Sequence, residues 1–128
     1  PTYLFVDRQQ NIYVSDKGNH RVMKWNKNAK KGIVVAGDQG EGNGLSQLSN
    51  PRGLFVDVSG NLFVADSMNH RVIRYRQGMR EGIVIVGGHG RGGEANQFNE
   101  LGGLSLDPQG NLYVVDHYNN RLQRFSLE

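Results

Sequence analysis

The sequence predicts an all-β fold made of repeated four-stranded sheets, and three observations lead to that prediction. A stretch of alternating apolar residues that ends in a polar turn occurs three times, as NIYVSDKGNHRV at 11–22, NLFVADSMNHRV at 61–72 and NLYVVDHYNNRL at 111–122. Each copy begins fifty positions after the one before it, without insertion or deletion. The 18 glycines and 3 prolines suit short strands joined by tight turns. A fixed period of this length is typical of solenoids and propellers.

The equivalence covers the whole chain, because Leu4, Leu54 and Leu104 also align. The pattern VDxxGNLFVADSMNHRV resembles the NHL repeat, whose family builds the blades of β-propellers. The resemblance implies one propeller segment over 1–128, with blades at about 1–50, 51–100 and 101–128, the last of them incomplete. Six blades are usual in that family, so the chain would supply half of a six-bladed ring.

Within the first repeat, runs of β-forming residues predict strands at 3–7, 11–16, 21–25 and 33–36. The later strands of the second repeat are expected at 73–75 and 83–86, and the third repeat stops after its third strand, which makes eleven strands. Apolar residues occupy both parities of these runs, for instance in the segment Leu62 to Ala65. A sheet with two apolar faces needs a cover on each side, and radial stacking of blades supplies it.

Two glycine-rich segments, 37–51 and 87–101, are expected to carry the chain from the outer strand of one blade to the inner strand of the next. Leu45, Leu48 and Phe98 are the apolar side chains expected to hold these crossings down. The aromatic residues Trp25, Tyr75 and Phe125 recur at one repeat position, which predicts that they belong to the blade core.

Eleven strands do not close a ring, since a propeller usually has at least about four blades. The chain is therefore expected to be either a piece of a longer chain or an oligomer in which open blade faces meet. A homodimer with six blades is favoured over a three-bladed monomer, because open faces would exceed the roughly 300–600 Å² apolar patch that monomers tolerate.

Composition excludes some classes of site. The chain has no cysteine, which excludes disulfides, zinc–thiolate sites and thiol nucleophiles. No apolar run approaches the roughly 20 residues of a membrane helix. A net charge of +3 and a pI of about 9.4 permit contact with polyanions without requiring it. The composition leaves the cellular compartment open.

An Asp, an Asn and an Arg recur around the polar turn of every repeat. A residue present in every blade is best explained by a role in every blade, with the Asp accepting turn N–H groups and pairing with the Arg, and the Asn suiting left-handed turn geometry. These structural residues are Asp16, Asp66, Asp116, Asn19, Asn69, Asn119, Arg21, Arg71 and Arg121.

Neither a metal site nor a cofactor is expected. Some members of the family that the chain resembles are amidating lyases that hold zinc with one His per blade at the channel mouth. His20 and His70 share a repeat position here, but the third copy has Asn120, and zinc needs three or four convergent ligands. A private calcium loop at 38–44 and a ring of carboxylates from Asp7, Asp57 and Asp107 are weaker alternatives.

The leading functional interpretation is a non-enzymatic binding or scaffold module whose propeller loops contact a protein or peptide, as resemblance to non-enzymatic NHL members implies. Its expected contact residues are loop positions that differ between repeats: Lys17, Ser67, Met68, His117 and Tyr118. The first alternative is single-stranded RNA binding through a basic rim formed by Lys24, Lys27, Arg74, Arg76 and Arg124. The second is a metal-dependent lyase or lactonase at the channel mouth, although no nucleophile, base and orienting group can be placed together.

Overall fold

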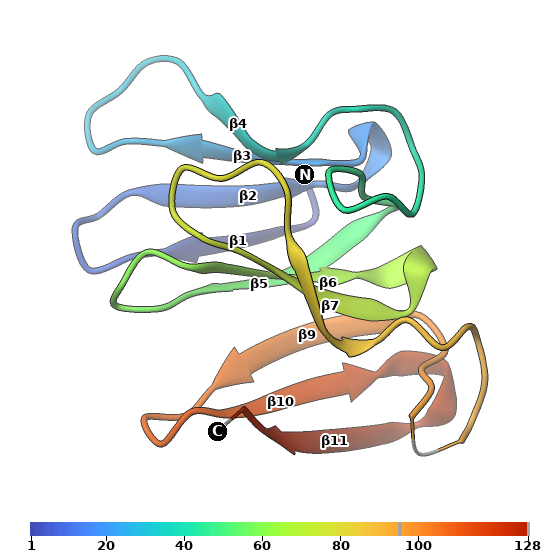
Figure 1. Cartoon of the computed structure of the whole chain (residues 1–128). Coiled ribbons are helices and arrows are strands. Elements are labelled where there is room, and N and C mark those ends of the chain that lie inside the picture. The colour runs from blue at the N-terminus through green and yellow to red at the C-terminus, as the bar shows by residue number, and fades with distance from the viewer. Residues whose placement is uncertain (95, 128) are drawn as a thin grey trace.

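The computed structural model describes residues 1–94 and 96–127, and within these residues eleven strands form three antiparallel sheets (Figure 1). The first sheet contains β1 (Tyr3–Val6), β2 (Ile12–Asp16), β3 (Arg21–Trp25) and β4 (Ile33–Gly37) in that order. The second contains β5 (Pro51–Val56), β6 (Leu62–Asp66), β7 (Arg71–Tyr75) and β8 (Ile83–Gly87), and the third contains β9 (Leu101–Leu106), β10 (Asn111–Asp116) and β11 (Arg121–Ser126). The all-β prediction is confirmed.

Three short 3-10 turns join the second and third strands of the sheets: η1 (Lys17–Asn19), η2 (Ser67–Asn69) and η3 (His117–Asn119). Most predicted strands agree with the structure to within one residue at each end. The exception is β7, which begins at Arg71 rather than at 73, because Arg71 lies opposite Asp66 as its register partner and extends the ladder.

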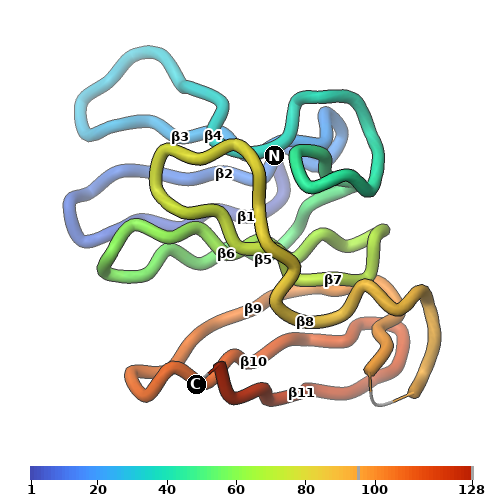
Figure 2. Tube along the Cα trace, in the orientation of Figure 1, coloured from blue at the N-terminus to red at the C-terminus, as the bar shows by residue number. Residues whose placement is uncertain are grey.

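The sheets stack face to face with their first strands adjacent, since β5 contacts both β1 and β9. Every residue of β6 is buried, so the middle sheet is covered on both faces as its apolar pattern predicts. One core cluster joins the first and second sheets around Val64 and Ile73, and another joins the second and third around Leu101 and Val114. In Figures 1 and 2 the three sheets form a fan with both crossings on one side.

The outer faces of the two end sheets are open. Leu4 is 68% exposed on the first sheet, whereas Leu54, at the same repeat position in the second, is 6% exposed. On the third sheet Leu122 is 65% exposed, whereas its equivalent Val72 is fully buried. Each sheet therefore has two packing faces. In the first sheet, the face equivalent to the one that the second sheet packs against the first is open. In the third sheet, the face equivalent to the one that the second sheet packs against the third is open.

Two of the three apolar residues expected to hold the crossings down do so, since Leu48 and Phe98 are essentially inaccessible. The expectation for Leu45 is wrong: its side chain is 43% exposed, and the residue anchors the crossing through its backbone, whose oxygen accepts a hydrogen bond from Gly82. Tyr75 is buried as core, whereas Trp25 and Phe125 are only partly buried.

Over the described residues, no helix has the length and apolar character needed to span a bilayer.

Candidate functional site

The end of the molecule that carries the 3-10 turns and the crossings (right in Figure 2) holds the densest polar network. In the second sheet the fully buried Asp66 lies at its centre. One carboxylate oxygen accepts the backbone N–H of Ser49 at 2.7 Å, and the other accepts Nδ2 of Asn69 and Nε of Arg71, both at 2.8 Å. The Asp66 side chain thus joins its own turn to the crossing that precedes the sheet.

Arg71 completes the same network from the next strand. Its Nη1 donates to the carbonyl oxygen of Asn43 at 2.9 Å, and its Nη2 donates to the carbonyl oxygens of Gly44 and Gln47 at 2.9 and 3.1 Å. One guanidinium therefore binds both the Asp66 carboxylate and three carbonyls of the crossing. The Gly44 carbonyl also accepts the N–H of Gln47 within the crossing, so the arginine adds a charged donor to a loop that is partly paired by itself.

The third sheet repeats this arrangement around Asp116, which accepts the N–H of Asn99 at 2.8 Å and Nε of Arg121 at 2.6 Å. Arg121 in turn donates to the carbonyl oxygens of the second crossing, at Gly93, Glu94 and Gln97. In the first sheet, among residues 1–94 and 96–127, Asp16 accepts side-chain hydrogen bonds from Asn19 and Arg21 alone, each at 2.9 Å.

The carboxylates of this network differ in burial, and their pKa values shift accordingly. The hydrogen bond from Asn19 is the largest cause of the lowered pKa of Asp16. At Asp116 burial opposes ionisation, but the hydrogen bonds from Asn99, Asn119 and Arg121 outweigh it and lower the pKa. Asp66 is as inaccessible to solvent as Asp116, but its partner Arg71 is 6% exposed whereas Arg121 is 31% exposed, and at this more enclosed pair burial raises the pKa of the Asp66 carboxyl.

The left-handed residue of each turn is not the Asn, which corrects the sequence-based interpretation of Asn19, Asn69 and Asn119. The left-handed conformation is found one position later, at His20, His70 and Asn120, which end the 3-10 turns with φ of 51–52°. The Asn side chain instead donates to the Asp, and in the second and third sheets also to a crossing carbonyl.

His20 and His70 link successive blades and do not converge on a metal. Nδ1 of His20 accepts the N–H of Asn50 and Nδ1 of His70 accepts the N–H of Glu100, both at 3.0 Å. Burial is the largest cause of a lowered pKa at His70, with the positive charge of Arg91 second. No group of three or more metal-binding side chains gathers among residues 1–94 and 96–127.

The carboxylates of Asp7, Asp57 and Asp107, considered for a cation ring, each bind the Asn four residues later in their own turn. The Asp107 pKa is lowered, chiefly by the hydrogen bonds from Asn111. These carboxylates therefore have turn partners of their own.

Of the five loop positions proposed as contact residues, four are at least partly accessible. Met68 is 41% exposed, Tyr118 is 54% exposed, His117 is exposed and Lys17 is partly exposed. The expectation for Ser67 is wrong, because its side chain is fully buried beneath the turn. Among the described residues its hydroxyl has no hydrogen-bond partner. The rings of His117 and Tyr118 lie 4.6 Å apart, which makes them a joint aromatic surface.

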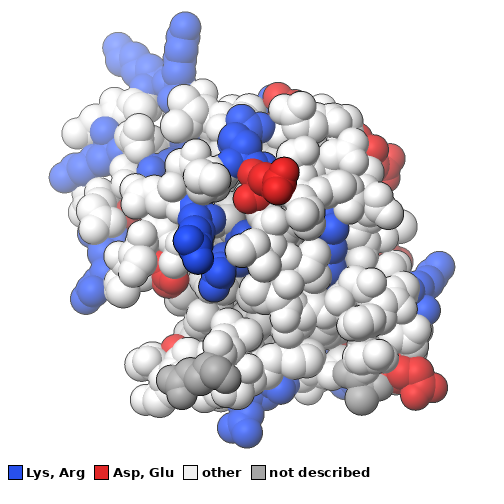
Figure 3. All heavy atoms as spheres, viewed as in Figure 1, with Lys and Arg blue, Asp and Glu red and all other residues white. Residues whose placement is uncertain are grey.

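The basic residues of the proposed rim differ in exposure, although their sequence pattern predicts one common surface. Lys24, Arg74 and Arg124 lie opposite the aromatic residues Tyr13, Phe63 and Tyr113 in the strand register. Lys27, Arg76 and Arg124 are exposed, whereas Arg74 is partly buried. In Figure 3 basic side chains project at the upper left, at the β3–β4 hairpin end of the first sheet. Lys24 lies 5.3 Å above the Tyr13 ring and, together with Arg76, borders a cavity between the first two sheets.

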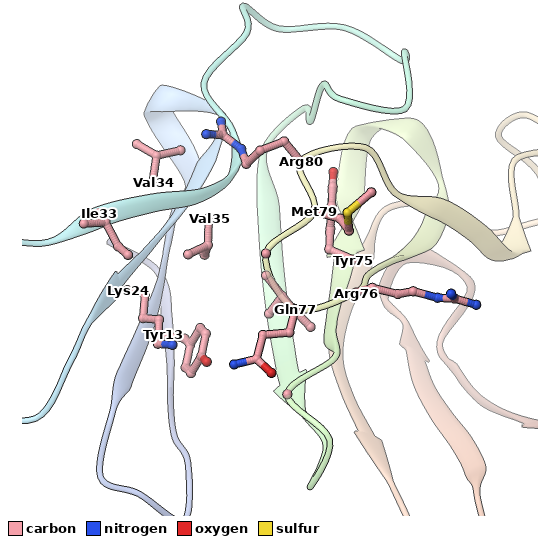
Figure 4. Close-up of a pocket in the computed structure, with 13 residues that line it drawn as sticks. Tyr13, Lys24, Ile33, Val34, Val35, Tyr75, Arg76, Gln77, Met79 and Arg80 are labelled. Carbon is pink, nitrogen blue, oxygen red and sulfur yellow. The ribbon is translucent and has the colours of Figure 1, made fainter.

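The sequence interpretation missed this cavity. Tyr75 belongs to the core, as its shared repeat position with Trp25 and Phe125 predicts, and it also lines the cavity (Figure 4); Phe125 differs from it by the absence of the hydroxyl. The sequence feature that could have indicated the cavity is the change of aromatic residue type at that repeat position. The cavity itself could not be predicted, because it depends on the angle between two sheets.

The sheets, their crossings and the Asp–Arg network between them define a segment of a β-propeller. The NHL repeat family matches the chain at residues 48–75 and 98–125, which are the second and third copies of the turn network with their strands. The chain belongs to the NHL-repeat family and forms about half of a six-bladed propeller.

Solved structures agree with this fold. A protein of unknown function from Bacteroides thetaiotaomicron matches with a TM-score of 0.80 at 16% identity, over 97% of this chain and 34% of that one. A streptogramin B lyase matches with a TM-score of 0.70 at 15% identity, over 96% and 36% of the two chains. A luciferin-regenerating enzyme matches with a TM-score of 0.65 at 18% identity, over 94% and 38%. The chain thus spans little more than a third of the length of these structures, and no curated protein matches it.

Proposed function

We propose that the chain is a non-enzymatic binding and scaffold module that presents propeller loops to a protein or peptide partner. The observation that supports this most directly is the contrast between a constant framework and variable tips at the end with the 3-10 turns. The turns share one backbone geometry, held by the Asp–Arg network, but display different side chains, with Met68, His117 and Tyr118 exposed. Large side chains on a rigid support suit recognition, because little conformational entropy is lost on binding.

We further infer that a six-bladed ring completes the module, formed by a second copy of the chain or by further repeats. The two open faces support this inference. Leu4 and Val6 are exposed at positions whose equivalents, Leu54 and Val56, are 6% exposed against the first sheet. Val115 and Leu122 are exposed at positions buried in the second sheet. The open face of the third sheet is thus equivalent to the face of the second sheet that packs against the third sheet.

Light scattering across a dilution series tests this inference. A mass near twice 14.3 kDa is expected if two chains close the ring. A mass of 14.3 kDa at every concentration would contradict the homodimer and leave completion by further repeats of a longer chain.

A peptide-library selection on the intact chain tests the binding surface. We expect the selected peptides to lose most of their affinity for the double variant Met68→Ser, Tyr118→Ser. The matched control is Lys30→Ser in the β3–β4 hairpin at the opposite end, which should bind them as the unmodified chain does (Figure 1). Peptides that bind the double variant and the unmodified chain equally well would overturn the proposed surface.

Single-stranded RNA is a second candidate partner, favoured by the position of Lys24 over the Tyr13 ring, since basic residues beside aromatic ones suit single strands. Retention on RNA that falls steeply with salt, with a log–log slope of about −0.7 per phosphate contacted, would support it. A metal-dependent lyase or lactonase is a third candidate, motivated by the lyase among the similar structures. Stoichiometric zinc or calcium that co-purifies with the chain would support that role.

A further inference from the structure

The first crossing contains one chemically labile link, between Asn43 and Gly44. Alone among the asparagines of the chain, Asn43 is followed by glycine. In such a pair the backbone nitrogen of the glycine reaches the side-chain amide carbon of the asparagine with little hindrance, because glycine has no Cβ. Asn43 is exposed, so water has access to it. The sequence thus favours spontaneous deamidation at this position.

The fold restrains both residues of this pair. The backbone N–H of Gly44 donates to Oε1 of Gln47 at 3.0 Å. The carbonyl oxygens of Asn43 and Gly44 accept Nη1 and Nη2 of Arg71, each at 2.9 Å. The nitrogen that would attack is therefore engaged in a hydrogen bond, and the carbonyls on both sides of it are held by one guanidinium. To react, Gly44 must first break its hydrogen bond to Gln47.

The restraint by Gln47 is a regular part of the crossing. Its Nε2 donates to the carbonyl oxygen of Gln39 at 3.1 Å, so the side chain bridges two parts of the loop. Gln97 does the same in the second crossing, where its Oε1 accepts the N–H of Glu94 at 3.3 Å. The two bridges differ in what they cover, because only the first one restrains an Asn-Gly pair.

The second crossing also shows that this loop geometry does not require an asparagine. Gly93 and Glu94 stand at the positions of Asn43 and Gly44, and their carbonyl oxygens accept Nη1 and Nη2 of Arg121 at 3.1 and 2.9 Å. The same backbone contacts are thus made by a pair that cannot deamidate. The Asn43 side chain adds chemical reactivity to a structure that forms without it.

We propose that Asn43 is a deamidation site whose rate is set by the hydrogen bond from Gly44 to Gln47. The Gly44 nitrogen gives its proton to a solvent base and bonds to Cγ of Asn43, the Cγ–Nδ2 bond breaks, and ammonia leaves. Water then opens the resulting succinimide ring at either of its two carbonyls. One opening gives aspartate, and the other gives isoaspartate, in which the backbone runs through Cβ and Cγ.

The isoaspartate product acts directly on the network around Asp66. The former carbonyl oxygen of residue 43, which Arg71 binds, then belongs to a free carboxylate, and the backbone gains one methylene group. Arg71 faces two carboxylates, and the carbonyls of Gly44 and Gln47 move away from its Nη2. The modification therefore weakens the support of η2, which carries the exposed Met68. This chemistry does not depend on the function proposed for that turn.

Incubation of the intact chain at mildly basic pH, followed by peptide-resolved mass spectrometry, tests the proposal. The readout is the mass gain that accompanies replacement of the amide NH₂ by OH in the peptide that contains Asn43. We expect at least about tenfold faster modification in guanidinium chloride, which unfolds the chain, than in buffer, because both hydrogen-bonded restraints are then lost. Equal rates in the two states, or no modification of the unfolded chain at Asn43, would overturn the proposal.

Matched variants separate the role of Gln47 from a general loosening of the crossings. In the folded chain Gln47→Ala should speed deamidation by about two- to tenfold, the effect of losing one hydrogen bond. Gln97→Ala removes the equivalent bridge and should leave the rate at Asn43 unchanged. Asn43→Gln should abolish the modification in both states, since its longer side chain disfavours the ring. An unchanged rate in Gln47→Ala, or an equal increase in Gln97→Ala, would refute the role of Gln47.

The modified chain carries an additional negative charge, so ion exchange separates it from the parent chain. We expect the isoaspartate form to unfold at a lower urea concentration than the parent, because Arg71 loses carbonyl partners in the crossing. Asn43→Asp is the control, since it adds the charge without lengthening the backbone and should unfold close to the parent. An isoaspartate form as stable as Asn43→Asp would contradict the effect on the network.

Discussion

Asp16 and Asp66 occupy the same repeat position and are followed by the same Asn-His-Arg turn, yet their contacts differ. Asp66 is fully buried and joins its turn to the crossing before it through the N–H of Ser49, whereas Asp16 binds Asn19 and Arg21 alone within the described part of the chain. The arginines differ likewise, because the side chain of Arg71 is 6% exposed and that of Arg21 is 30% exposed. In the second and third sheets, the network therefore includes backbone groups of the preceding crossing, which the network of the first sheet lacks within residues 1–94 and 96–127.

The comparison explains why the same motif is a strong structural element in one blade and a local turn in another. Buried charges contribute only when every hydrogen bond is made, and in the second blade the crossing makes them. In the first blade those groups meet no crossing within the described chain. Stability in this fold is therefore a property of the junctions between blades more than of single blades.

The largest expected effect comes from removing the buried carboxylate. Asp66→Ala leaves Arg71 enclosed without its counter-charge, and we expect a loss of about 3–5 kcal/mol in the free energy of unfolding. The matched variant Asp16→Ala should cost only about 0.2–1 kcal/mol, because that pair is partly solvated. Urea unfolding followed by circular dichroism measures both. Equal losses would show that the crossing adds nothing to the motif.

The next effect concerns the inner strands, where β5 and β9 approach closely. A Cβ on Gly53 would lie 2.7 Å from Cα of Gly103, whereas a Cβ on Gly103 would meet nothing within 4 Å. We expect Gly53→Ala to cost about 1–3 kcal/mol through overpacking, and Gly103→Ala to stay within about 0.5 kcal/mol of the unmodified chain. Thermal unfolding of the pair tests this, and the reverse order would contradict the close approach.

The smallest effect is a pH dependence at the junction of the second and third blades. Burial lowers the pKa of His70 below 6.5, so the unfolded chain binds the proton more readily. The contribution of His70 is fully present above about pH 6.5 and is lost as the pH falls toward the lowered pKa. His70→Asn, which installs the residue of position 120, should reduce the loss of stability between pH 7.5 and 5.5. The unfolding midpoint in urea at both pH values is the readout, and an unchanged pH dependence would contradict this role.

Much of the fold could be predicted from the sequence because its information is local and repeated. Alternation in segments such as Leu62 to Ala65 identified strands with two covered faces, and the fifty-residue period identified equivalent strands. The site was less predictable. Ser67 varies between repeats as a contact residue would, but it is buried, because the crossing packs over η2 and Met68 donates its N–H to Ser49.

The repeat, the order of the strands, the apolar faces and the pairing of Asp with Arg five residues later could be inferred from the amino-acid sequence, since each depends on neighbours along the chain. The folded molecule was needed to find that His20 and His70 bind the next crossing, thirty residues on, and that Tyr75 lines a cavity with Lys24 and Arg80. These contacts depend on how one sheet is angled and spaced against the next. A repeat pattern specifies each sheet, whereas packing between sheets specifies what lies in the junctions.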